Sequence, residues 1–298
     1  MERRNFIKNT VLTAGLLSLS HKELFAMIND PAFKVTMLRD NLGIFTEKGG
    51  TIAFLLSKEG IVVVDAQFPE QANHLITDLK TRSDKPFQML INTHHHGDHT
   101  SGNIAFKGIV PHVVAHVNSL ANQTRVAEEQ KSTDKQLFPD ITFTDNWKAK
   151  VGEEKIMAHY FGPGHTNGDA IIHFEHANIA HMGDLVFNRR YAFIDKSAGA
   201  SISNWITVLD KTLKTFDNKT LFVFGHAFDP AKVTGNKEDL KAMQSYLANL
   251  LSFVESSIKA GKTKEEILAS KSIPNVTEWQ GDGIERGLTA AYIELTNK

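Results

Sequence analysis

The sequence contains no cysteine among its 298 residues, which excludes disulfide bonds, thiolate nucleophiles and thiolate metal ligands. Any metal ion must therefore be held by nitrogen and oxygen atoms. A charge imbalance is also absent, because 33 Lys and Arg residues stand against 34 Asp and Glu residues and give a formal net charge of -1. Without net positive charge or long basic runs, the chain has no electrostatic support for binding a nucleic acid backbone.

Long apolar runs are missing as well. The mildly apolar residues 10–20 are too few to span a bilayer, and no later segment is typical of a transmembrane helix, so we expect no stable membrane insertion. This stretch follows Arg3 and Arg4 and precedes a small residue, Ala26, which is the order found in a twin-arginine export signal. We therefore expect residues 1–26 to be a signal peptide and the mature protein to be exported, to the periplasm. The alternative is an ordinary basic amphipathic start.

The composition is that of a soluble globular protein, with 41% apolar and 22% charged residues. From Lys34 the pattern becomes strand-like, with short β-branched and aromatic runs separated by Asp-Asn, Gly-Gly and Glu-Gly turn signals. Pro69 then begins "PEQANHLITDLKTR", whose apolar residues recur at helical spacing. "FQMLIN" follows and predicts a buried strand.

The remaining chain contains a second strand-rich half. A short strand is expected at Val113 and Val114, and an irregular stretch reaches to about Val151. Later strands are expected in "KIMAHYF", "DAIIHFE", "ANIAHMGD" and "LFVFGH". Helices are expected at Asn118 to Lys131, Ser203 to Phe216, Lys237 to Lys259 and Lys264 to Ala269. Because no linker separates the halves, we expect one domain with two sheets packed face to face inside helical layers.

A dense motif follows the strand "FQMLIN". Within "INTHHHGDHTSGN", the residues His94, His96, Asp98 and His99 form the pattern H-x-H-x-D-H. Three later segments each carry one more imidazole or carboxylate beside glycine, which allows sharp turns and close backbone approach. These are "GPGHTNGD" with His165, "HMGDLVF" with Asp184 and "FGHAFDP" with His226.

This ordered set resembles the metallo-β-lactamase superfamily. The resemblance extends over nearly the whole mature chain and includes "GGTIAFLLSKEGIVVVDAQ" as the opening hairpin. It implies an α/β fold, a four-layer αββα sandwich, over residues 27–298, with a site for two metal ions. Carried over position by position, the ligands of the first ion are His94, His96 and His165, those of the second are Asp98, His99 and His226, and Asp184 bridges the two.

The resemblance also implies a chemistry. Two Zn2+ per chain, with Fe or Mn as alternatives for an all-nitrogen-and-oxygen site, activate a water so that metal-bound hydroxide attacks an acyl bond. The substrate is then a small molecule with a lactam, a lactone or other ester, or a thioester. Asp98 is expected to be catalytic as well as a ligand, because it can orient the water or receive its proton.

The residue type at position 184 distinguishes between branches of the family. Subclass B1 β-lactamases have a cysteine there, whereas glyoxalase II-like hydrolases and lactonases have a bridging aspartate, so the chain resembles the latter. Glutathione thioesters are used mainly in the cytoplasm, so export of the protein argues against them as its substrates. Two other functions remain open: a mononuclear iron sulfur dioxygenase, and a non-catalytic metal-binding protein on the same scaffold. The sequence does not predict the oligomeric state.

Polar residues downstream of Asp184 are candidates for substrate binding. These are Arg189, Arg190, Lys196 and Asn204, with Ser201 beside them. Around the ligands, His95 is expected to be a supporting or solvated residue, and Asp65 and Asp169 are expected to support turns or ligand loops. The remaining histidines in or beside strands are interpreted as structural.

Overall fold

The first β-sheet has seven strands in the order β1-β2-β3-β4-β5-β6-β7. A computed structural model describes residues 33–296, so the expected signal peptide at residues 1–26 lies outside the described residues. The strands are β1 (Lys34–Arg39), β2 (Leu42–Thr46), β3 (Ile52–Ser57), β4 (Gly60–Val64), β5 (Phe87–Ile91), β6 (Val113–His116) and β7 (Ile141–Phe143). The pairs β2/β3 and β3/β4 are antiparallel, and β4 through β7 are parallel neighbours. Strand β4, "GIVVV", is buried along its whole length, as the apolar run predicts.

The second sheet has six strands in the order β15-β13-β11-β10-β9-β8. They are β8 (Asn146–Val151), β9 (Glu154–His159), β10 (Ile171–Phe174), β11 (Ile179–His181), β13 (Leu221–Val223) and β15 (Thr234–Gly235). The neighbours are antiparallel except for β11 and β13, which run parallel. Two short strands, β12 (Phe187–Asn188) and β14 (His226–Ala227), pair separately.

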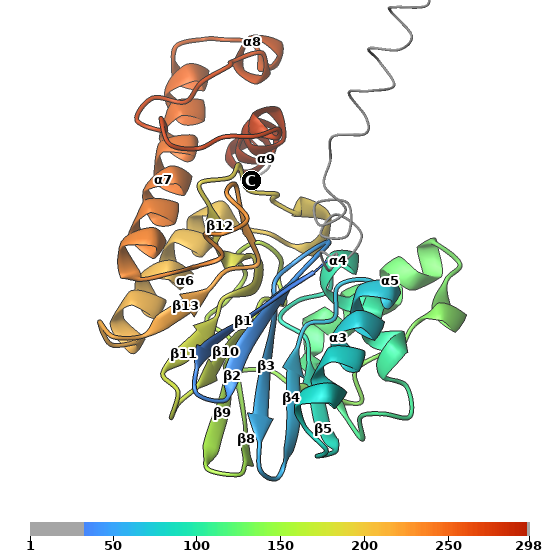
Figure 1. Cartoon of the computed structure of the whole chain (residues 1–298). Coiled ribbons are helices and arrows are strands. Elements are labelled where there is room, and N and C mark those ends of the chain that lie inside the picture. Colours follow the sequence, from blue (N-terminus) through green and yellow to red (C-terminus); the bar gives the residue numbers. More distant parts are fainter. Residues whose placement is uncertain (1–32, 297–298) are drawn as a thin grey trace, which may run out of the picture. The chain divides into compact units, whose positions relative to one another are not determined.

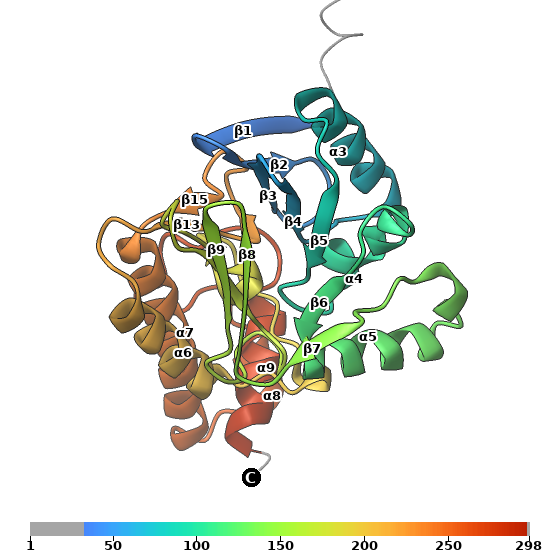
Figure 2. The same cartoon turned by 90° about the horizontal axis from the view of Figure 1, so that it is seen from below.

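The two sheets face each other between layers of helices (Figures 1 and 2). Helices α3 (Pro69–Arg82) and α5 (Val117–Glu129) lie beside the first sheet, and α6 (Ile202–Thr215) and α7 (Lys237–Lys259) lie beside the second. Two further helices, α8 (Lys264–Leu268) and α9 (Ile284–Thr296), complete that side. The expected four-layer αββα sandwich is confirmed.

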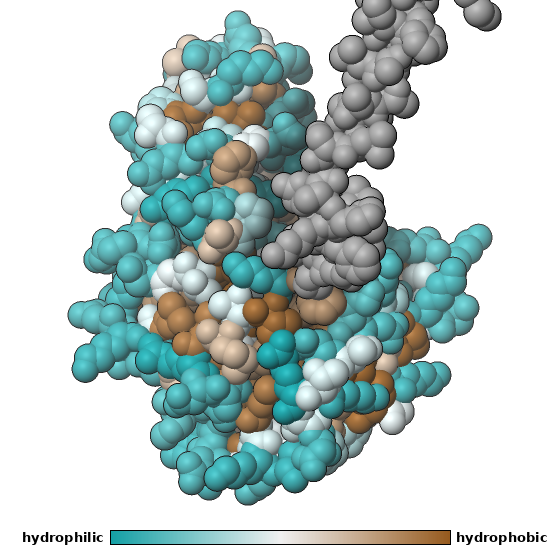
Figure 3. All heavy atoms as spheres, in the orientation of Figure 1, coloured by the Kyte–Doolittle hydropathy of each residue, from teal (hydrophilic) through white to brown (hydrophobic). Residues whose placement is uncertain are grey.

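Two apolar clusters account for the layers. One joins residues of both sheets, such as Leu55 and Val62 with Ile172 and Phe174, and fills the space between them. The other joins the second sheet to its helices through residues such as Trp205. On the face drawn in Figure 3, polar side chains cover most of the surface and apolar ones form small groups. No helix among residues 33–296 is long and apolar enough to cross a membrane.

One expectation about local structure was wrong in part, and one helix was not predicted. The stretch that ends at Val151 is irregular only as far as residue 140, because β7 and β8 follow. In β8, lysines at alternate positions face solvent, and this exposed face concealed the strand pattern. Helix α9 was not predicted, because Gly287 interrupts its pattern and its buried side consists of small residues apart from Leu288.

Candidate metal centre

The seven candidate ligands come together at one edge of the two sheets. Four lie after β5, in the segment containing the short helix α4 (Gly97–Thr100), and one each lies before β10, after β11 and after β13. Parallel strands β11 and β13 end at the same edge, and antiparallel β10 begins there. The seven residues are His94, His96, Asp98, His99, His165, Asp184 and His226, and their side chains form two adjoining clusters.

The first cluster consists of three imidazoles and Asp184. Nδ1 of His96 lies 3.1 Å from Nε2 of His94 and 2.8 Å from Nε2 of His165. Oδ2 of Asp184 is 3.5 Å from Nε2 of His165 and 3.9 Å from Nε2 of His94. Each residue therefore directs one donor atom at a common point.

The second cluster consists of Asp98, His99 and His226. Oδ2 of Asp98 lies 3.0 Å from Nε2 of His226 and 3.9 Å from Nε2 of His99. Asp184 also takes part, because its Oδ1 is 3.0 Å from Nε2 of His99 and its Oδ2 is 3.5 Å from Nε2 of His226. The Asp184 carboxylate thus stands between the two clusters, because its Oδ2 is equally close to His165 of the first and His226 of the second, while its Oδ1 faces His99.

In His94, His99 and His165, the ring nitrogen that points away from the clusters has a hydrogen-bond partner. Nδ1 of His99 donates to Oδ2 of Asp65 at 2.7 Å, and Nδ1 of His165 donates to the carbonyl of Phe193 at 2.7 Å. Nδ1 of His94 faces Oγ1 of Thr93 at 3.1 Å, and this hydroxyl donates its own proton to Asp65, so it accepts from His94. With a proton on the outward nitrogen, a neutral imidazole keeps a lone pair on its inward nitrogen, which can then bind a metal ion.

Two inward atoms show what this arrangement requires. Nε2 of His99 and Oδ1 of Asp184 are buried and make no well-aligned hydrogen bond with any residue in the described range, although they lie 3.0 Å apart. Buried polar atoms without such partners are costly, and a divalent cation would satisfy both. The donor set of imidazoles and carboxylates therefore fits Zn2+, and also Fe or Mn.

Asp65 and Asp195 support the ligands from behind. Asp65 has a left-handed backbone (φ 65°) and holds the backbone N–H of Thr93 as well as His99, in agreement with its expected supporting role. Asp195 was missed by the sequence analysis. Its Oδ2 accepts from Nε2 of His96 at 2.9 Å, while its Oδ1 accepts the N–H groups of Ser197 and Ala198.

The sequence signal for Asp195 was limited to its local role as the cap of a short turn. Its contact with His96 spans 99 positions, which no spacing rule reveals. His95 is buried rather than solvated, with Nε2 3.7 Å from Oδ2 of Asp195. Asp169 accepts from the N–H groups of Gly164 and Thr166, and so supports the His165 loop as expected.

The charge states differ between the clusters. Burial lowers the pKa of His94 well below its usual value, and burial together with His96 lowers the pKa of His165 to about 3. Burial opposes a charge on His99 too, but Asp184 and Asp65 outweigh it and hold the pKa of His99 well above its usual value. Burial disfavours the charged form of Asp98, yet His99 and His226 outweigh it and lower the pKa of Asp98 to about 2. Burial thus favours the neutral form of His94 and His165, whereas the neighbouring carboxylates favour the protonated form of His99.

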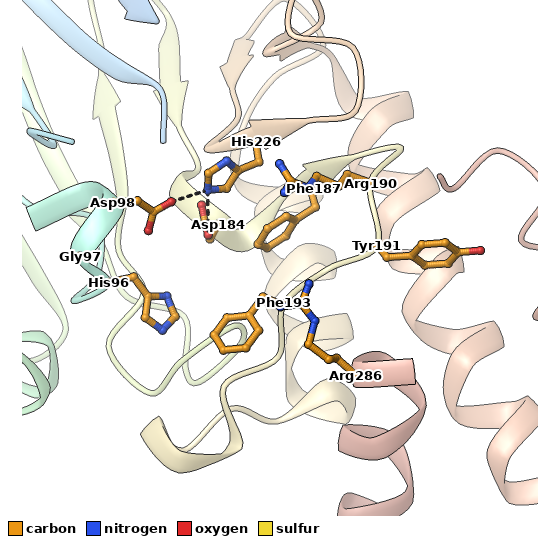
Figure 4. A pocket seen from close by; sticks show the side chains of 10 residues that line it. All are labelled: His96, Gly97, Asp98, Asp184, Phe187, Arg190, Tyr191, Phe193, His226 and Arg286. Carbon is orange, nitrogen blue, oxygen red and sulfur yellow. Dashed lines mark ion pairs between the residues drawn. The ribbon is translucent and has the colours of Figure 1, made fainter. Parts of the chain in front are cut away.

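A pocket of about 310 Å³ opens over the clusters. It is lined by His96, Gly97, Asp98, Asp184, Phe187, Arg190, Tyr191, Phe193, His226 and Arg286 (Figure 4). Both clusters therefore face the same space, with ligands on one side and aromatic and basic side chains on the other.

Only one of the four substrate-binding candidates lines this pocket, namely Arg190. Arg189 pairs with Glu278 at 2.7 Å, and Lys196 pairs with Glu294 at 3.0 Å. Asn204 donates to the carbonyl of Pro163 at 2.6 Å, behind the His165 loop. The structure does not bring these three residues to the pocket.

Five pocket residues were not candidates in the sequence analysis, namely Gly97, Phe187, Tyr191, Phe193 and Arg286. Phe193 is exposed at the pocket although it is a large apolar residue, and Arg286 extends from the unpredicted helix α9. The sequence of α9 gives no signal that this helix packs beside the H-x-H-x-D-H motif, because the two are far apart along the chain.

Comparison with known proteins identifies relatives of this arrangement. A family model described as the metallo-beta-lactamase superfamily matches residues 46–226. A metallo-beta-lactamase type 2 from Elizabethkingia meningoseptica is 24% identical over 205 residues, which cover 66% of this chain and 79% of that protein. A probable hydroxyacylglutathione hydrolase from Schizosaccharomyces pombe is 25% identical over 210 residues, covering 66% and 73%.

A solved structure supports the same assignment of the fold. The structure titled metallo-beta-lactamase from Pontibacter korlensis superposes with a TM-score of 0.62 at 22% identity, and the match covers 73% of this chain and 99% of that chain. The segment matched by the family model contains all seven candidate ligands and ends before α8 and α9.

Proposed function

The chain belongs to the metallo-beta-lactamase superfamily, and from that premise we propose that it is a hydrolase that uses two metal ions to cleave an acyl bond. Zinc is the proposed metal, with iron or manganese as alternatives. The proposed substrate is a small molecule with a lactam, a lactone or other ester, or a thioester. Relatives named as metallo-beta-lactamases and as a hydroxyacylglutathione hydrolase support this range.

We assign the seven ligands by cluster. The first ion is held by His94, His96 and His165, and the second by Asp98, His99 and His226. Asp184 would be shared by the two ions, because its carboxylate contacts His165 of the first cluster and His99 and His226 of the second. When bound, such ions act as Lewis acids and lower the pKa of a water to about 7.

Asp98 is proposed as the catalytic carboxylate. Its side chain is 31% exposed and lines the pocket, so it can reach a water or substrate there. Its pKa, lowered to about 2, keeps it ionised at neutral pH and able to orient the attacking water and accept a proton. Asp184 is only 4% exposed and is better placed to hold the two clusters together.

The observation that carries this proposal is the set of inward donor atoms in two clusters joined by Asp184. A mononuclear iron dioxygenase would need only one of the clusters, so the second cluster favours the hydrolase. The intact donor set also favours an enzyme over a non-catalytic metal-binding protein.

The proposal is tested with the purified protein and three substrates, a β-lactam, a lactone and a thioester. We expect hydrolysis of at least one, its loss on chelation and its return with Zn2+, Fe2+ or Mn2+. Hydrolysis that persists after complete removal of metal would contradict the proposal. Oxygen uptake on a persulfide by a protein with one iron would support the dioxygenase instead.

We also propose that residues 1–26 direct export to the periplasm and that residues 27–298 form the mature catalytic domain. Replacing the pair by lysines, Arg3→Lys with Arg4→Lys, should retain the full-length protein in the cytoplasm, as measured by cell fractionation. Unchanged export of the double variant would contradict twin-arginine export.

A further inference from the structure

Two arginines flank the pocket over the candidate metal centre. Arg190 follows β12, and Arg286 belongs to α9, beyond the segment matched by the family model. In Figure 4 the Arg190 side chain lies on the Phe187 side of the pocket and Arg286 on the Phe193 side. The guanidinium carbon of Arg286 is 5.8 Å from the centre of the Phe193 ring. Two distant parts of the chain thus contribute a positive charge to one pocket.

Neither pocket arginine has an acidic partner in the part of the chain that the structure describes. Among residues 33–296, no carboxylate oxygen lies within ion-pair distance of either guanidinium group. The neighbouring Arg189 differs, because it pairs with Glu278 at 2.7 Å and with Asp239 at 3.5 Å and lies over the ring of Trp279. Arg189 thus has carboxylate partners, whereas Arg190 and Arg286 have none within residues 33–296.

Two aromatic side chains give the pocket an apolar part of its wall. Phe193 is one of four large apolar side chains that are exposed among the described residues, at 39%. Phe187 lines the same space and stacks on the ring of His226, with ring centres 5.4 Å apart. Exposed aromatic surface beside unpaired guanidinium groups matches a ligand with an apolar segment that ends in an oxyanion.

We propose that Arg190 and Arg286 form an anion subsite and that the substrates are small acyl compounds bearing an oxyanion, such as a carboxylate, on an apolar segment. This proposal rests on the proposed hydrolase function, since it names the substrate class of the same site. Guanidinium groups bind carboxylates and sulfonates through paired hydrogen bonds, and the subsite would hold the anionic end while the acyl bond lies over the clusters. A pocket of about 310 Å³ restricts the substrate to a small molecule.

The kinetic test compares 4-nitrophenyl hydrogen glutarate, which ends in a carboxylate, with its neutral methyl ester in the metal-loaded protein. We divide kcat/KM for the carboxylate substrate by kcat/KM for the methyl ester. This ratio should fall about 10- to 100-fold in Arg190→Gln and in Arg286→Gln, because each variant removes hydrogen bonds to a charged group. The matched control is Arg189→Gln, which removes the same charge at a position outside the pocket and should keep the wild-type ratio. A sulfonate analogue shows whether the subsite distinguishes planar from tetrahedral oxyanions.

A binding test separates failure of the subsite from failure of the hydrolase. Calorimetry with 4-phenylbutyrate and with 4-phenylbutanol should show tighter binding of the anion, lost in both pocket variants and retained in Arg189→Gln. If no ester is hydrolysed but this pattern holds, the subsite stands and the hydrolase proposal fails. If hydrolysis occurs and neither pocket variant changes the ratio or the binding, the subsite is overturned.

Discussion

The two ligand clusters differ in burial and in charge. In the first, His94 and His165 are at most 1% exposed, and His96 is the one imidazole of the three that lines the pocket, at 17% exposed. In the second, Asp98 is 31% exposed, and a carboxylate replaces one imidazole. The first cluster is therefore richer in imidazole, a donor that suits zinc, whereas the second has a larger share of oxygen donors and is more open to the pocket.

The largest expected effect comes from removing Asp184, the residue that contacts both clusters. Asp184→Ala should deplete both clusters of metal and lower hydrolysis about 10³-fold or more, because several kcal/mol of transition-state stabilisation depend on the ions. Metal analysis and kcat/KM measure this. Asp84→Ala, an exposed carboxylate away from the clusters, is the control. Full metal content in Asp184→Ala would contradict a bridging role.

Variants that remove one ligand from one cluster should have a smaller effect and should distinguish the two clusters. His96→Ala removes a ligand of the first and His226→Ala a ligand of the second, so each variant should fall from about two bound ions to about one. Spectroscopy of the cobalt-substituted proteins should then give different signatures for the ion that remains. Identical spectra in the two variants would show that the clusters do not act as separate sites.

The supporting carboxylates should have weaker effects again. Asp65→Asn and Asp195→Asn keep the size of the side chain but lose the charge that orients His99 and His96. Changes of this kind typically weaken metal affinity about 10- to 100-fold. We expect Asp65→Asn to weaken the second cluster and Asp195→Asn the first, measured by chelator competition. If both variants weaken the same cluster, the assignment of the two supports is wrong.

Competition between protons and metal ions should produce the smallest difference between the two clusters. The raised pKa of His99 keeps it protonated at neutral pH in the metal-free protein, so an ion entering the second cluster must displace that proton. Its affinity should therefore rise by up to tenfold per pH unit until the pH passes the pKa of His99. The lowered pKa values of His94 and His165 leave the first cluster nearly insensitive over the same range. Calorimetry in buffers of different ionisation enthalpy counts the released protons, and equal release from both clusters would contradict this difference.

The sequence predicted the sandwich and the candidate ligands because those signals are local or ordered along the chain. The H-x-H-x-D-H motif lies within six residues, and glycine marks the loops of His165, Asp184 and His226. The contacts of Asp195 and Arg286 with the site could not be predicted in this way, because they depend on how distant segments pack. Lys196 and Asn204 are close to Asp184 in sequence, but the packing of distant segments places them against Glu294 and the carbonyl of Pro163 and not in the pocket.

The central claim is that the two clusters hold two ions, and the metal-to-protein ratio of the purified wild-type protein tests it most directly. Elemental analysis after loading with zinc and removal of excess metal should give a ratio of about two. A ratio of one, or none, would contradict the account.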